Sequence, residues 1–201
     1  MERRDALKNL GLSIGGITMS STVIGLLQSC SGKSNLTWNP EIFDSQEAEL
    51  ITKTLEVILP KTEDIPGATE LNLTQFIDGY IKHVSGSEEQ KSIKKLAEKY
   101  LSTTKATLGK KNVADMSLDD IDSRLAYYLK ADKSQIDQWS NEDSDDASNY
   151  NFLNSLRSRG VSAFKMSEYI GEKVLAYSPI PGQQIGCVDL NEATGGKAWS
   201  I

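Results

Sequence analysis

Side chains that could carry out chemistry are few and scattered. His83 is the one histidine in the 201-residue chain, and it lies beside the apolar stripe of a predicted helix. A lone histidine in such a position is more often a hydrogen-bonded structural residue than a catalyst or a ligand. The cysteines are not spaced to complete a zinc site with it. We therefore expect no catalytic and no metal-ligating residue, and a hydrolase that uses His83 is the weakest alternative.

The acidic run at residues 140–149 has the alternate spacing of a calcium-binding loop over residues 141–145. Two later positions argue against that function. Asp146 stands where such a loop needs glycine for its sharp turn, and Phe152 stands where a bidentate glutamate belongs. We therefore interpret residues 140–149 as a solvated loop.

The two cysteines, Cys30 and Cys187, lie in different kinds of sequence, so a disulfide framework is not expected. Cys187 is interpreted as a small apolar filler. The net charge of -6 and the pI near 4.9 argue against a nucleic-acid partner, because phosphate backbones are bound by clustered Lys and Arg. The composition, 38% hydrophobic and 25% charged, is that of an ordinary globular domain.

The first thirty residues have the pattern of an export signal. Arg3 and Arg4 open a basic segment, and residues 10–27 then carry no charge. A positive region followed by an apolar region is typical of secretory signals, and the arginine pair indicates the twin-arginine type. The alternative is an uncleaved anchor helix, but the stretch is barely long enough to span a bilayer and contains several glycines.

Cys30 ends the tetrapeptide Leu27-Gln28-Ser29-Cys30, which resembles a lipobox. We expect Cys30 to be lipidated, and multiple acyl chains would hold the protein at a membrane surface. The predicted organisation is a twin-arginine signal with lipobox over residues 1–30, a polar tether over 31–40, and a helical domain over 41–201.

Apolar residues after Pro40 recur at the i, i+3, i+4 spacing of amphipathic helices. Asp44 with Glu47, and Ser117 with Asp120, have the spacing of capping boxes, and Gly109 is placed to end a helix. Strand-like alternation is nearly absent. The predicted helices cover residues 44–59, 74–84, 87–108 and 118–129, with a fifth from about residue 150 and a sixth that includes 169–175. We therefore predict an all-α compact bundle of five or six helices.

Two details of the predicted helices concern their ends and faces. Thr74 is expected to cap the second helix, and Ser87 with Gln90 to form a capping box for the third. The buried stripe of the second helix is predicted to contain Phe76, Ile77, Tyr80, Ile81 and Val84.

Beyond Tyr177 the chain is rich in proline and glycine, which prevents long regular structure. We expect an irregular, extended C-terminal tail that lies against the helices, with Trp199 as its anchor.

Several motifs resemble the gluconate 2-dehydrogenase subunit 3 family. In the tail they are Tyr177-Ser178-Pro179-Ile180-Pro181-Gly182, Gly186-Cys187 and Gly196-Lys197-Ala198-Trp199. Nearer the N-terminus they are Ile58-Leu59-Pro60-Lys61-Thr62, Pro66-Gly67-Ala68 and Phe76-Ile77-Asp78. The similarity covers nearly the whole chain, and the signal-like segment also fits the family.

The resemblance implies a non-catalytic accessory (gamma) subunit of a membrane-associated dehydrogenase that oxidises sugars or sugar acids. FAD is then expected in a separate large subunit and no cofactor in this chain. A cytochrome is a further possible partner, and the small subunit would lead the large one through the twin-arginine translocase to the periplasmic side of the membrane. The alternative is a freestanding envelope lipoprotein that binds a ligand or has a structural role.

The tail residues Tyr177, Pro179, Pro181 and Trp199 are of the aromatic and rigid types that interfaces favour. We interpret them as a possible partner interface. The alternative, at least as well supported by the sequence, is that they pin the tail to its own helices.

Overall fold

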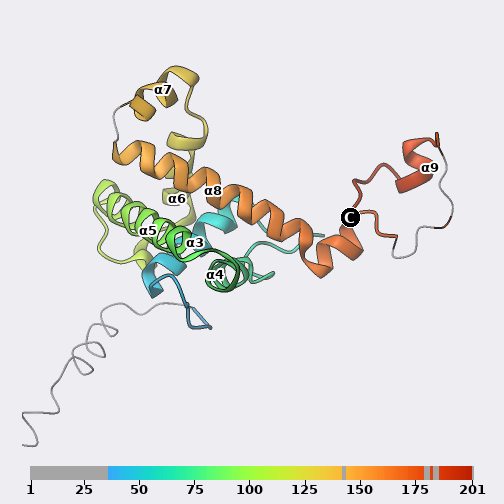
Figure 1. Ribbon diagram of the computed structural model, residues 1–201, viewed down its shortest axis with the longest axis horizontal. Helices are drawn as coiled ribbons and strands as arrows, with labels where there is room; N and C mark the ends of the chain where they lie inside the picture. The colour runs from blue at the N-terminus through green and yellow to red at the C-terminus, as the bar shows by residue number, and fades with distance from the viewer. Residues whose placement is uncertain (1–35, 142–143, 179–181, 183–185, 201) are drawn as a thin grey trace, which may run out of the picture. The chain divides into compact units, whose positions relative to one another are not determined.

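The computed structural model describes residues 36–141, 144–178, 182 and 186–200. Every regular element in these ranges is helical, apart from one isolated β-bridge near the C-terminus, so the predicted all-α fold is confirmed (Figure 1). None of the helices described is both long and apolar enough to cross a membrane. The elements are α3 (Ser45–Ile58), α4 (Leu73–Val84), α5 (Ser87–Leu108), the 3-10 turn η1 (Val113–Asp115), α6 (Leu118–Leu129), α7 (Lys133–Asn141), α8 (Asp145–Met166), the π-helix η2 (Ile170–Val174) and α9 (Leu190–Thr194).

Helix α3 forms the centre of the core and begins at the predicted capping box. Asp44 accepts the amide of Glu47 at 2.8 Å, and the Glu47 carboxylate accepts the amide of Asp44 at 2.9 Å. The helix ends before Pro60, which cannot continue it. Its inward side chains, such as Leu55, are fully buried against α4, α5, α6 and α8. The local capping signals therefore place this helix correctly.

Helix α8 is the long element on which the others pack, and it contacts α3, α4, α5, α6 and α7. Gly160 lies at its crossing with α3. A Cβ atom there would come within 2.5 Å of Leu55 Cδ2, so only glycine allows the two helices to approach this closely. The groove described below lies on the same half of α8.

The prediction of a solvated loop over residues 140–149 is wrong. Helix α7 continues to Asn141, and α8 already begins at Asp145 with Ser144 as its N-cap. Of the acidic residues that suggested a loop, Asp145 and Asp146 lie in the first turn of α8, where the helix dipole favours negative charge. Asn149 is fully buried.

Two predicted caps are also wrong. Thr74 is buried inside α4, where it accepts a hydrogen bond from the Thr52 hydroxyl, and the N-cap is Asn72 in the left-handed region at φ 52°. Helix α5 starts after Gly86, so Ser87 is already helical. Gln90 instead donates to backbone carbonyls at the end of α4, including Ser85 O at 2.8 Å. Sequence spacing identified polar residues near the helix ends but not their partners.

The segment before α3 is fastened to α4 by one carboxylate. Asp78, buried in α4, accepts the backbone amides of Glu41 at 2.7 Å, Ile42 at 3.1 Å and Phe43 at 3.1 Å. Its place in the motif Phe76-Ile77-Asp78 therefore has a structural reason. We call these three hydrogen bonds the Asp78 clamp.

Gly67 gives the motif Pro66-Gly67-Ala68 its structural reason. A Cβ atom at Gly67 would lie 2.7 Å from the backbone nitrogen of Lys61 and collide with the Glu56 carboxylate. That carboxylate accepts the amide of Thr69 at 2.8 Å and so holds the loop in place. Only glycine fits where the loop folds over α3.

The C-terminal tail returns to the end of η2. Ala176 donates its amide to Ala198 O at 2.8 Å, and Ser200 donates to Ala176 O at 3.0 Å, which forms the bridge between Ala176 and Trp199. The short helix α9 interrupts the otherwise irregular tail. Cys187 is exposed, so its interpretation as a buried apolar filler is wrong.

Candidate partner-docking groove

Large apolar side chains on α4 and at the end of α8 remain exposed to solvent. Phe76 is 51% exposed, Tyr80 45% and Met166 76%. The predicted buried stripe of α4 is therefore wrong for Phe76, Tyr80 and Val84, whereas Ile77 and Ile81 are buried as predicted. Helix α4 carries apolar residues over a wider arc than α3 and α8 cover. The uncovered part of that arc is the surface of interest.

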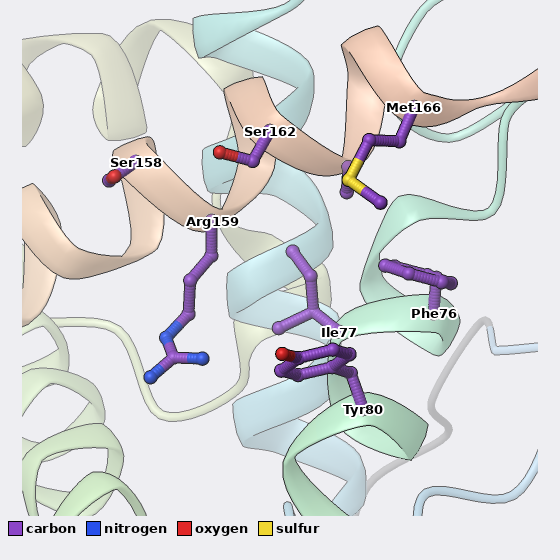
Figure 2. Close-up of a pocket in the computed structure, with 8 residues that line it drawn as sticks. Phe76, Ile77, Tyr80, Ser158, Arg159, Ser162 and Met166 are labelled. Carbon is purple, nitrogen blue, oxygen red and sulfur yellow. The ribbon is translucent and has the colours of Figure 1, made fainter. Parts of the chain in front are cut away.

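A groove of about 240 Å³ runs between α4 and the end of α8 (Figure 2). Phe76 and Tyr80 project from α4 toward it, with their ring centroids 6.2 Å apart, and Met166 faces them from α8. Arg159 is the charged residue among those that line the groove. The lining residues, which we call the α4–α8 groove, are Phe76, Ile77, Tyr80, Ser158, Arg159, Ser162, Ala163 and Met166.

One end of the groove is charged and the other is apolar. Arg159 Nη2 donates to Glu89 Oε1 of α5 at 2.6 Å, and both side chains are partly exposed. Met166 at the other end also borders a second hollow, of about 400 Å³, which is lined by Tyr177 and Ser200 of the tail among others. The groove therefore reaches from the start of α5 toward the tail.

The chemistry of the groove is suited to binding rather than to bond making. Aromatic residues, Met and Arg are the types enriched in protein interfaces. Ser158 and Ser162 supply hydroxyls, but no base in the lining stands ready to activate them. Elsewhere in the residues described, no group of three or more His, Cys, Asp or Glu side chains could hold a metal ion.

A buried polar network joins α5, α6 and α8 away from the groove. Arg124 donates to the Tyr128 hydroxyl at 2.9 Å, and that hydroxyl donates to Asp146 at 2.8 Å. Asn149 donates to Tyr128 at 3.0 Å and to Thr103 at 2.9 Å. Burial raises the pKa of Tyr128 to about 12, so the phenol stays protonated near neutral pH. The network fixes three helices and offers no nucleophile.

Of the predicted interface residues, Tyr177 and Trp199 are described, and both lie outside the groove lining. Tyr177 and Trp199 are brought near each other by the Ala176 bridge, and both are about half exposed. The tail backbone is thus held to its own domain, while these rings stay available to solvent. Pro179 and Pro181 lie outside the described residues, as do Arg3, Arg4 and Cys30.

His83 lies on the surface, where its Nε2 is 3.5 Å from Glu41 Oε1. The histidine lines neither of the hollows described above. The interpretation of His83 as a hydrogen-bonded structural residue stays a prediction. Sequence reasoning missed the groove itself. Its one available signal was the excess of apolar residues around α4.

The structure is thus a small all-α domain that carries an exposed apolar groove between α4 and α8. A comparison with protein families then identifies the particular group. The family model described as gluconate 2-dehydrogenase subunit 3 matches residues 45–182, from the first residue of α3 into the tail. The chain belongs to this family of accessory subunits of dehydrogenase complexes, whose partner is a larger dehydrogenase. No curated protein and no solved structure matches the chain.

Proposed function

We propose that this chain is the non-catalytic subunit of a flavin dehydrogenase that oxidises sugars or sugar acids. It supports the folding of the large flavin subunit, its export by the twin-arginine pathway and its attachment to the membrane. In this proposal FAD resides in the large subunit, and a cytochrome accepts the electrons. Family membership supports the role of a subunit, and the Arg3-Arg4 pattern supports the export route.

The observation that carries the proposal is the exposed α4–α8 groove. A domain of this size has enough residues to cover its own core, yet it leaves two aromatic rings and a methionine on one face. Contiguous apolar surface of this kind usually marks an interaction site. A subunit that works through contact with a larger protein accounts for such a face.

The deciding experiment follows the large subunit in cells with and without this chain. A tagged large subunit should co-purify with this chain from membranes and should carry its flavin. Without this chain we expect the large subunit to stay in the cytoplasm and to lose dehydrogenase activity at the membrane. Normal export and activity of the large subunit without this chain would refute the proposal. Recovery of this chain alone from membranes would favour a freestanding lipoprotein.

Two variants separate export from anchoring. Replacing Arg3 and Arg4 with lysine keeps the charge but removes the twin-arginine signal, so both subunits should remain in the cytoplasm. Cys30→Ala removes the expected lipid site, so both should be exported and appear in the soluble periplasmic fraction. Membrane retention of the Cys30→Ala complex would show that the anchor lies elsewhere.

A further inference from the structure

We propose that the α4–α8 groove receives a large apolar side chain from a segment of the dehydrogenase subunit that also carries a carboxylate, and that this carboxylate pairs with Arg159. The inference rests on the proposed function. It goes further by naming the contact surface on this chain and the chemistry of the partner segment.

The size and lining of the groove favour a side chain as its occupant. Its volume of about 240 Å³ is smaller than the pockets that hold drug-sized ligands, roughly 300–1,000 Å³. One or two apolar side chains would occupy this volume. Phe76, Tyr80 and Met166 supply aromatic and thioether surface, which is the environment that apolar anchor residues occupy in interfaces.

The charge around the groove favours an acidic partner segment. Residues 147–167 of the sequence include Arg157, Arg159 and Lys165 but no Asp or Glu, although the whole chain has a net charge of -6. Within the ranges that the structure describes, only Arg159 of these three forms an ion pair. A partner carrying carboxylates would therefore meet a part of α8 that has three cations and no carboxylate of its own, on an otherwise acidic protein.

Arg159 is placed to bind a second carboxylate beside Glu89. Its Nη2 atom donates to Glu89, and the planar guanidinium has further N–H donors. Figure 2 shows this side chain extending from α8 to the level of Tyr80, next to the apolar lining. A carboxylate that follows an apolar anchor in the partner can reach both features at once. A charge-assisted hydrogen bond between arginine and a carboxylate is stronger than one between neutral groups.

A photo-crosslinking pair on α8 tests the location. Ser162 lines the groove and Val161, the preceding residue, is exposed but does not line it. p-Benzoylphenylalanine is placed at either position in the full-length chain, which is co-expressed with the large subunit and illuminated. We expect crosslinks to the large subunit from position 162 and at least about fivefold fewer from position 161. Mass spectrometry of the joined peptide should find an apolar residue with Asp or Glu within one helical turn.

A second pair of variants tests the carboxylate contact. Arg159→Gln and Glu89→Gln both abolish the internal ion pair, but only Arg159→Gln removes the cation that borders the groove. In binding measurements with detergent-solubilised full-length subunits, Arg159→Gln should raise the Kd about tenfold and weaken its dependence on salt. Glu89→Gln should change the Kd less than about threefold. Equal effects of the two variants would overturn the proposed pairing.

The outcomes separate this inference from the proposed function. If the subunits co-purify but position 162 crosslinks no more than position 161, the groove is not the contact and the accessory role still stands. Crosslinking of position 162 to a second copy of this chain, or to a peptide without a carboxylate, also overturns the inference. If no complex forms in the wild type, the proposed function fails first.

Discussion

Replacing Asp78 with alanine should destabilise the domain by removing the Asp78 clamp. The carboxylate is 1% exposed and accepts the amides of residues 41–43. Hydrogen bonds to a charged group contribute about 1.5–3 kcal/mol each, so three of them set an upper limit of roughly 5–9 kcal/mol. The true loss is smaller, because Glu41 is exposed and Ile42 half-buried, and their amides can bind water instead.

The amide of Phe43 determines the remaining cost. Phe43 is buried, and its amide would lose its partner without full access to solvent. We therefore expect Asp78→Ala to lower the free energy of unfolding by about 2–4 kcal/mol. For a domain of this size that corresponds to a fall in Tm of about 5–15 °C. Asp78→Asn keeps the shape and one acceptor oxygen, so it should cost less than Asp78→Ala.

Thermal unfolding followed by circular dichroism measures this effect, with Asp122→Ala as the control. Asp122 is an exposed carboxylate on α6, and its removal should change stability by less than about 0.5 kcal/mol. Hydrogen exchange supplies a local readout, because the amide of Phe43 should lose protection before the amides inside α3. If Asp78→Ala and Asp122→Ala unfold at the same temperature, the clamp does not stabilise the fold and the reasoning is wrong.

Further predictions concern packing and pH. Gly160→Ala should lower stability by about 1 kcal/mol, because crowding against α3 outweighs the gain in helix propensity. Gly79→Ala, where a Cβ atom meets open space, should raise it by about 1 kcal/mol, and denaturant unfolding compares the two. Because burial raises the pKa of Tyr128 to about 12, the stability of the fold should fall as pH rises from 10 toward 12. Ultraviolet absorbance should detect the ionisation of this phenol at high pH, and Tyr128→Phe should remove that signal. The Lys110 ammonium lowers the pKa of Asp120 to about 2, so the stabilising effect of this carboxylate should persist above pH 3.8 and disappear as pH falls toward 2. Asp120→Asn should flatten that acid limb in unfolding measurements.

The helices with local start and stop signals could be predicted from the sequence. The pairs Asp44 with Glu47 and Ser117 with Asp120 act within four residues, so their spacing alone identifies them. Gly109, at φ 64°, likewise ends α5 as predicted. These pairs bind within their own turn and need no other part of the fold, whereas Ser87 with Gln90 has the same spacing and failed because Gln90 binds the end of α4 instead.

Features that depend on distant partners could not be predicted. Asp78 binds amides more than thirty positions away, and nothing near it in the sequence indicates this. The exposure of Phe76 and Tyr80 depends on how much of α4 the other helices cover. Acidic residues such as Asp145 and Asp146 are common both in solvated loops and in the first turn of a helix. Their composition therefore could not distinguish the two, and the packing of α8 determines the helix. The groove needs two helices at once, and no single stretch of sequence contains it.

The Asp78 clamp also determines where a mechanical load enters the domain. A force that pulls on the chain before residue 41 acts first on the three hydrogen bonds to Asp78. These bonds transmit the force to α4 before it can reach α3. The same α-helix carries Phe76 and Tyr80 on its uncovered side. If the chain before residue 41 were attached to a membrane and a partner were bound in the groove, both forces would act on α4. Most of the hydrophobic core would then carry little of the force, so a bound partner need not destabilise this domain.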